Sequence, residues 1–326
     1  MSKPKLAIVI PAYKGVYFDD TMQSIANQSC KDFVLYIGDD ASPDDLKRIV
    51  EPYEGKISIR YKHFEKNLGG TDLVAHWDRC INLSEGEEWI WLFSDDDMMD
   101  SNCVEKLYQA VNNDPGFDIF HFDLTIIDES SKPIADGTPF PAILTAEEFL
   151  SRRLKGAINS TVVEYIFRRS RFEESKGFQN FDLAWGSDDA TWIKLAANKG
   201  IKNIDGAKVS WRKSRFNISP NYHNRDLLKR KFQAELDFLR WAYGLIINNE
   251  LGNNATYLVQ QLEQWFLQNI KARANFITFK QIRAMLFDLG GILQKQYSRA
   301  TLITLFSYKS MSAIKKQLKK IYSPAR

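Results

Sequence analysis

Three consecutive carboxylates, Asp95, Asp96 and Asp97, follow an apolar run at residues 89–93. A buried strand that ends in this way places oxygen ligands at the rim of a sheet, where open α/β sheets bind their ligands. Carboxylates this close repel one another unless a cation lies among them, and Mg²⁺ and Mn²⁺ favour oxygen ligands. The triplet therefore predicts a metal site that holds nucleotide phosphates. The alternative is an exposed acidic loop or the acidic first turn of a helix.

Residues suited to nucleotide binding follow the two earliest strand-like runs. The first run, residues 6–10, leads into Pro11, Ala12 and Tyr13. The Tyr13 ring could stack on a nucleobase, although an aromatic lid over the core explains it as well. The second run, residues 33–37, leads into Asp39 and Asp40, where a carboxylate could accept a hydrogen bond from a base N–H or a ribose hydroxyl.

The segments after these carboxylates have simpler explanations. Ser42 is expected to cap a helix over residues 43–52. Asn67, Gly69 and Gly70 follow the third strand-like run and predict a turn. The two glycines would also allow the backbone to approach a phosphate closely.

A second acidic pair, Asp188 and Asp189, lies at the expected start of another helix. Ser187 or Asp188 as a helix cap explains part of this pattern. The functional interpretation makes one carboxylate a general base, with Asp188 preferred and Asp189 the second choice.

Further candidates for phosphate or sugar contacts are Trp185, Arg212 and Asn217. The four histidines show no metal-ligand spacing and are expected to be structural.

The elements that position these residues alternate between strand and helix over roughly the first two hundred residues. Short apolar runs separated by stretches of helical periodicity predict an α/β fold with a mostly parallel sheet flanked by helices. From about residue 224 the pattern is helical without strand-like runs. We therefore predict a catalytic domain over residues 1–222, with nucleotide binding in 1–100 and the acceptor side in 101–222. A helical region is expected over residues 223–326.

Composition limits the class of protein. The 326 residues are 44% hydrophobic, which suffices for a core, and the three cysteines have no metal-like spacing. The three cysteines suit a reducing cytoplasm, and no apolar run of about 20 residues exists that could span a membrane. No feature predicts a nucleic-acid partner.

The net charge is unevenly distributed along the chain. The chain is +3 overall, but residues 289–326 hold eight basic and no acidic residues, which leaves −5 for residues 1–288.

Taken in order, these motifs resemble family-two inverting glycosyltransferases of the GT-A fold. The similar segments are residues 8–13, 23–28, 39–44, 94–97 and 186–192. The resemblance covers about residues 4–220. It implies that Tyr13 and Asp40 hold a base, usually uracil, that Asp96 in the DXD-like motif binds Mn²⁺ or Mg²⁺, and that Asp95 faces ribose or sugar. Asp97 is the second candidate metal ligand.

The sequence departs from the family pattern at three positions. Lys14 stands where asparagine is common, Ser94 replaces an acid of the metal motif, and Ser214 stands where histidine often occurs. The resemblance implies a hexosyltransferase-like enzyme that uses a nucleotide-sugar donor and a glycan or lipid-linked acceptor in polysaccharide biosynthesis. The rivals are a nucleotidyltransferase acting on sugar phosphates and a non-catalytic nucleotide-sugar binding module.

The basic C-terminus has its own interpretation. Met311, Ile314, Leu318 and Ile321 recur at helical spacing beside lysines. A helix over residues 310–326 could lie on an anionic membrane surface, as in a peripheral protein, or pack on its own domain.

Overall fold

The computed structural model describes residues 5–217 and 224–307 of the chain. It divides into two compact units after Asn217, and each is described here by itself. The domain boundary predicted at residue 222 lies outside the described residues, as do His223 and the predicted helix over residues 310–326.

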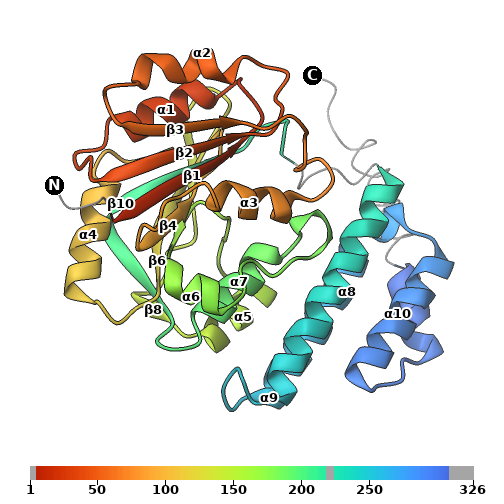
Figure 1. Cartoon of the computed structure of the whole chain (residues 1–326). Helices are drawn as coiled ribbons and strands as arrows, with labels where there is room; N and C mark the ends of the chain where they lie inside the picture. The colour runs from red at the N-terminus through yellow and green to blue at the C-terminus, as the bar shows by residue number, and fades with distance from the viewer. Residues whose placement is uncertain (1–4, 218–223, 308–326) are drawn as a thin grey trace, which may run out of the picture. The chain divides into compact units, whose positions relative to one another are not determined.

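The first half of the sheet in the N-terminal unit is parallel (Figure 1). Its strands, in spatial order, are β3 (Ser58–His63), β2 (Phe33–Asp39), β1 (Leu6–Ala12) and β4 (Trp89–Leu92). All residues of β2 and β4 are buried, as the continuous apolar runs predict for strands covered on both faces. Ala12 lies opposite Asp39, and Asp39 lies opposite His63. The carboxyl ends of these strands therefore form a single edge.

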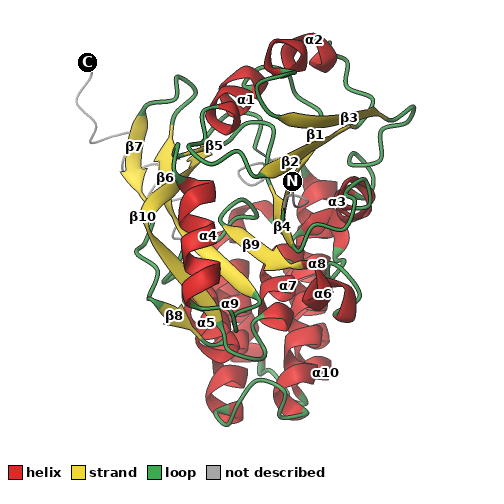
Figure 2. Ribbon diagram, turned by 60° about the vertical axis from the view of Figure 1, so that its left-hand side comes forward, coloured by secondary structure: helices red, strands yellow, loops and turns green. Residues whose placement is uncertain are grey.

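The second half of the sheet is mixed (Figure 2). It contains β9 (Tyr165–Arg168), β6 (Ile119–Ile127), β10 (Ile201–Arg212) and β5 (Met98–Met99), with β7 (Pro133–Asp136) and β8 (Ile143–Leu144) at its margins. Strand β9 is antiparallel to both β4 and β6, whereas β10 is parallel to β6. The α/β prediction is confirmed, but the mostly parallel pattern ends at β9.

Helices cover both faces of the parallel strands, with α1 and α2 on one side and α3 on the other (Figure 1). The helices of this unit are α1 (Phe18–Ala26), α2 (Leu46–Val50), α3 (Leu73–Ile81), α4 (Cys103–Asn113), α5 (Ala146–Leu154), α6 (Arg169–Glu174) and α7 (Ser187–Leu195), with short 3-10 turns η1 (Glu51–Tyr53) and η2 (Asp182–Ala184). A capping box formed by Thr145 and Glu148 begins α5. The expected cap at Ser42 is wrong, because Asp45 caps α2.

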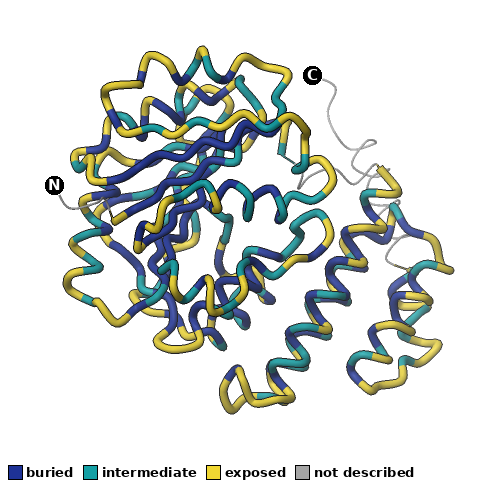
Figure 3. The backbone as a smooth tube through the Cα atoms, viewed as in Figure 1, coloured by how far each residue is buried: buried dark blue, intermediate teal, exposed yellow. Residues whose placement is uncertain are grey.

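The buried residues lie between these layers (Figure 3). Many of these core residues are aromatic. Trp91 stacks on Phe122 with ring centroids 5.4 Å apart, and its indole N–H donates to the Val163 carbonyl. These contacts join β4 to β6 and to the start of β9, so the residues after β4 have a rigid base.

The C-terminal unit is helical, as predicted. Its described helices are α8 (Arg225–Ile247), α9 (Ala255–Ala272) and α10 (Phe279–Leu293), with the short turn η3 (Ala274–Phe276). Asn224 caps α8, and a capping box at Thr278 begins α10. Within the described residues, none of the helices is both long and apolar enough to cross a bilayer.

Candidate active site

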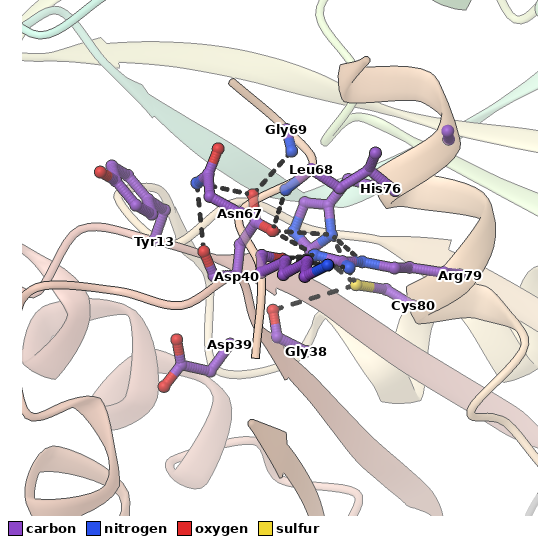
Figure 4. A network of polar contacts seen from close by, with 12 residues as sticks. Tyr13, Gly38, Asp39, Asp40, Asn67, Leu68, Gly69, His76, Arg79 and Cys80 are labelled. Atoms are coloured by element: carbon purple, nitrogen blue, oxygen red, sulfur yellow. Dashed lines mark hydrogen bonds and ion pairs between the residues drawn. The ribbon is translucent and has the colours of Figure 1, made fainter. Parts of the chain in front are cut away.

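The Asp40 carboxylate lies at the centre of a saturated hydrogen-bond network (Figure 4). The Asp40 side chain is 2% exposed. One oxygen accepts from the Leu68 N–H at 2.7 Å and from Arg79, and the other accepts from the Gly69 N–H at 2.8 Å and the Asn67 amide at 3.0 Å. A base N–H could reach this carboxylate only by displacing a present donor. Asp40 therefore acts first as the anchor of the 67–70 loop.

That loop can approach Asp40 because it carries glycine. A Cβ added at Gly69 would lie 2.8 Å from Asp40 Oδ2, and one at Gly70 would lie 2.5 Å from Asn67 Oδ1. The Asn67 oxygen in turn accepts from the Gly70 N–H at 2.9 Å. The side chain of Asn67 thus closes the turn while its amide contacts Asp40.

The sequence interpretation missed two members of this network, His76 and Arg79. Arg79 Nε donates to His76 Nδ1 at 2.9 Å, while its guanidinium pairs with Asp40. Burial lowers the pKa of His76 to about 4, so the imidazole is neutral and its Nδ1 can accept. His76, Arg79 and Cys80 share one face of α3 at helical i, i+3, i+4 spacing, which is the signal that could have identified them.

Asp39 turns away from Asp40 (Figure 4). Its carboxylate accepts from the Ser42 N–H at 2.8 Å, from the Tyr61 hydroxyl at 2.5 Å and lies 2.9 Å from His63 Nδ1. Asp39 therefore joins β2 to β3. This placement corrects its assignment to the nucleotide site.

The loop after β1 is held by Asp95. One Asp95 oxygen accepts from the backbone N–H groups of Tyr13 and Lys14, each at 2.7 Å. Pro11 and Ala12 end the strand, and the Tyr13 side chain is 42% exposed, so its ring is available for stacking. Burial and then the neighbouring Asp96 charge raise the pKa of Asp95 to about 6.

Asp96 and Asp97 differ in what they contact. Asp96 accepts from the Ser94 hydroxyl at 2.5 Å, and its other oxygen lies 3.8 Å from Lys14 Nζ. Asp97 accepts from the Arg212 N–H at 2.7 Å. Burial and the Asp96 charge raise the pKa of Asp97 well above its usual range.

No group of three His, Cys, Asp or Glu residues arranged to hold a metal ion occurs within residues 5–217 and 224–307. Asp96 nevertheless fits a divalent ion bound by one protein carboxylate together with substrate phosphates, an arrangement usual for Mg²⁺. Asp97 accepts a hydrogen bond from the β10 backbone and is 2% exposed, so the structure favours Asp96 over Asp97 as the metal ligand.

Arg212 is fully buried at the end of β10. Its guanidinium donates to the Asp96 carbonyl at 2.7 Å, the Asp128 carbonyl at 3.1 Å and the Asp20 carboxylate at 3.0 Å. The expected contact of Arg212 with phosphate is therefore wrong in this structure, since the side chain instead braces the loop after β4.

Asn217 is also engaged internally, because its side-chain oxygen accepts from the N–H and hydroxyl of Ser214 at 2.6 and 3.0 Å. Trp185 is half-buried just before Gly186. Gly186, with φ of 82°, precedes α7 without a side-chain cap, so the expected cap at Ser187 or Asp188 is wrong.

The structure separates the two acids at the start of α7. Arg153 binds Asp189 through both carboxylate oxygens, at 2.8 to 3.0 Å. Asp188 is half-buried, and within the described residues no side chain forms a hydrogen bond or ion pair with its carboxylate. Burial and then the Asp189 charge raise the pKa of Asp188 to about 7. A carboxylate with this pKa is suited to accept a proton near neutrality.

A buried acid that the sequence interpretation missed, Glu164, connects these regions. Its carboxylate accepts from the Thr161 N–H at 2.5 Å and hydroxyl at 2.6 Å, and burial raises its pKa to about 8. Burial is the main cause of the raised pKa of both Asp97 and Glu164, with a smaller contribution from the Glu164 charge to Asp97 and from the Asp188 charge to Glu164. Glu164 therefore lies within electrostatic reach of both Asp97 and Asp188. The sequence feature that could have identified Glu164 is a single acid inside the apolar run at residues 162–167.

Comparison with known proteins gives a consistent result. Residues 7–172 match the model of glycosyl transferase family 2. The chain is 24% identical over 202 residues to the GalNAc(5)-diNAcBac-PP-undecaprenol β-1,3-glucosyltransferase of Campylobacter jejuni, a match covering 61% of this chain and 62% of that protein. It is 26% identical over 196 residues to the putative teichuronic acid biosynthesis glycosyltransferase TuaG of Bacillus subtilis, covering 59% and 72%.

The fold is similar to that of residues 1–349 of TarS from S. aureus, solved in complex with UDP-GlcNAc. The TM-score is 0.64 at 15% identity, and the match covers 95% of this chain and 91% of that one. This likeness shows the predicted GT-A fold, with its sheet flanked by helices and followed by a helical region. Because the family model covers about half of the chain and includes the strands that form the site, the chain belongs to glycosyl transferase family 2.

Proposed function

We propose that the chain is a metal-dependent, inverting glycosyltransferase. It transfers a sugar from a UDP-sugar to a hydroxyl of a glycan or lipid-linked acceptor, in the assembly of a cell-surface polysaccharide. The observation that carries this proposal is the contrast at the start of α7, where Asp189 is paired with Arg153 and Asp188, with its pKa raised to about 7, is not. The names of the relatives support the acceptor class, and the solved TarS complex supports a UDP-sugar donor.

The donor side has a rigid frame. We assign the exposed Tyr13 ring to stacking on the base, with the 67–69 backbone, which Asp40 holds, lining the nucleotide site. Asp95 fixes the loop that carries Tyr13. Asp96 would hold Mn²⁺ or Mg²⁺, which when bound supplies positive charge to the leaving diphosphate.

The transfer step uses Asp188 as general base. The acceptor oxygen forms a bond to the anomeric carbon as the bond from that carbon to the diphosphate oxygen breaks, and UDP leaves with the electron pair. Asp188 takes the acceptor's hydroxyl proton. Because attack and departure are on opposite faces, an α-linked donor gives a β-linkage.

The test is product formation by the purified chain with Mn²⁺, a panel of UDP-sugars and a short lipid-linked or glycan acceptor. We expect acceptor-dependent release of UDP. Release of pyrophosphate from a nucleoside triphosphate and a sugar phosphate would instead indicate nucleotidyl transfer. Binding of UDP-sugar without any product would indicate a binding module.

The cellular place of the protein is a separate part of the proposal. We propose a cytoplasmic protein that contacts the anionic inner face of the membrane through residues 310–326, whose basic and apolar pattern suits such a surface. Sedimentation with vesicles containing phosphatidylglycerol should fall when these residues are deleted. Equal sedimentation of both forms would contradict it.

A further inference from the structure

Lys14 places an ammonium group at the candidate metal ligand. Its Nζ lies 3.8 Å from Asp96 Oδ2, and the Lys14 side chain is 36% exposed while that of Asp96 is 9% exposed. Among the ion pairs formed by described residues, this is the pair that reaches a carboxylate of the 95–97 triplet. Arg212 contacts the triplet only through the Asp97 carboxylate and the Asp96 carbonyl.

The backbone of Lys14 is fixed although its side chain is partly exposed. The Lys14 N–H donates to Asp95 at 2.7 Å, and the preceding Tyr13 carbonyl accepts from the Ser42 hydroxyl at 2.6 Å. The loop therefore aims the flexible lysine stem at Asp96. A lysine ammonium is a compact charge on a mobile chain, so it can exchange partners without backbone movement.

The other side chains near Asp96 leave few protein ligands for a divalent ion, so the effect of Lys14 on metal binding is larger. Ser94, which replaces an acid, donates to Asp96 Oδ1 at 2.5 Å, and Asp97 is committed to the Arg212 N–H. A divalent ion would therefore find one protein carboxylate, whose outer oxygen faces an ammonium. Binding at Asp96 must displace that ammonium, because like charges at this distance repel.

We propose that Lys14 is a resident counter-ion that competes with the divalent metal for Asp96 and pairs with the donor diphosphate once displaced. This inference rests on the proposed function for the identity of the donor. It makes the free protein a weak metal binder. Metal and nucleotide then strengthen each other's binding, because the diphosphate supplies both ligands for the metal and a new partner for the ammonium.

The test compares Lys14→Met with a matched control, Lys5→Met, at the opposite end of β1. Calorimetry with Mn²⁺ alone should show about three- to tenfold tighter binding for Lys14→Met than for the wild-type chain. Binding of UDP in EDTA should be weaker by a similar factor. Lys5→Met should change neither, and Lys14→Arg, which keeps the charge, should bind Mn²⁺ no more tightly than wild type.

Unchanged or weaker Mn²⁺ binding by Lys14→Met, with an unaltered thermal midpoint, would overturn the inference. So would an absence of Mn²⁺ binding in both forms. The expected Mn²⁺ shift in a protein that never turns over a UDP-sugar would instead reject the proposed function and leave the competition at Asp96 standing.

Discussion

Two pairs of adjacent aspartates, Asp39–Asp40 and Asp188–Asp189, differ in how their carboxylates are paired. Both members of the first pair are buried and accept several hydrogen bonds from neighbouring strands, loops and Arg79. In the second pair, Asp189 is neutralised by Arg153, whereas burial and the Asp189 charge raise the pKa of Asp188 to about 7. The first pair builds a rigid surface, and the second leaves one carboxylate available for reaction.

The difference shows how one fold separates binding from chemistry. A carboxylate that accepts four hydrogen bonds gains little by taking a proton, so it serves as a fixed anchor. A carboxylate buried beside another acid is costly to ionise, and this cost brings its pKa near the pH at which a base must work. Glu164, whose pKa burial raises to about 8, extends the second environment toward the end of β4.

Asp188→Asn should have the largest effect on turnover. The amide cannot accept the acceptor's proton, so we expect kcat to fall about 10²- to 10⁴-fold. UDP binding, measured by calorimetry with Mn²⁺, should be close to wild type because the donor contacts are elsewhere. If donor affinity fell as much as kcat, Asp188 would be part of the binding surface and the contrast between the pairs would be lost.

The neighbouring substitution, Asp189→Asn, should mainly affect folding. Removal of this carboxylate leaves the Arg153 guanidinium without its bidentate partner. Breaking a fully buried pair costs about 3–5 kcal/mol, so this partly buried pair should cost up to that amount. Chemical denaturation of the two variants side by side would check this. A stable Asp189→Asn protein without activity would move the base assignment to Asp189.

The pH profile of kcat/KM should have an acidic limb near the pKa of Asp188. The base works only when ionised, and its pKa is raised to about 7 by burial first and then by Asp189. Activity should therefore rise with pH through about 7 and fall about tenfold per pH unit below it. A limb near pH 4 would show that the group in the working enzyme is an ordinary solvated carboxylate.

The sequence predicted β1, β2 and β4 because their apolar runs are continuous and almost wholly buried. It also predicted β3, whose residues are exposed or partly buried. It did not predict β9 or β10. β10 is interrupted by a bulge between Ile204 and Lys208, with Gly206 at φ of 84°. Local periodicity is lost at such a break, and the pairing with β6 that forms the strand is a tertiary interaction.

The site was predicted at the level of segments rather than of individual side chains. Strand ends predicted that Asp40 and Asp96 lie at one edge of the sheet, and the second acidic pair predicted Asp188 at the start of a helix, but the sequence could not show which carboxylate oxygens already accept hydrogen bonds. Arg212 illustrates the limit, since the sequence offers this arginine as a candidate for phosphate contact until its buried contacts are known. Which partners a polar side chain contacts depends on residues far apart in the chain.

Asp40→Asn tests whether the first aspartate pair has a structural role. One oxygen becomes an NH₂ group that faces present donors, which should cost about 2–3 kcal/mol of unfolding free energy and loosen the 67–70 loop. We expect a higher KM for the donor and little change in kcat. The double variant Asp40→Asn/Arg79→Met should recover part of the stability, because the arginine charge is removed as well. An unchanged stability with lost turnover would place Asp40 in the chemistry instead.

The smallest effect should come from His76, which supports the same network through Arg79. Burial lowers its pKa to about 4 in the folded protein, whereas an unfolded imidazole titrates near 6.5. The unfolded chain therefore takes up a proton first as pH falls below about 6.5, and the folded state loses stability until about pH 4.

His76→Asn removes this contribution. Between pH 6.5 and 5, the unfolding free energy of wild type should therefore fall by about 1–2 kcal/mol more than that of the variant. Urea denaturation at these two pH values measures the difference. The buried His121 titrates in both proteins and cancels in the comparison. Parallel pH dependence of the two proteins would mean that the His76 pKa is the same in the folded and unfolded states, so that burial does not keep this imidazole neutral.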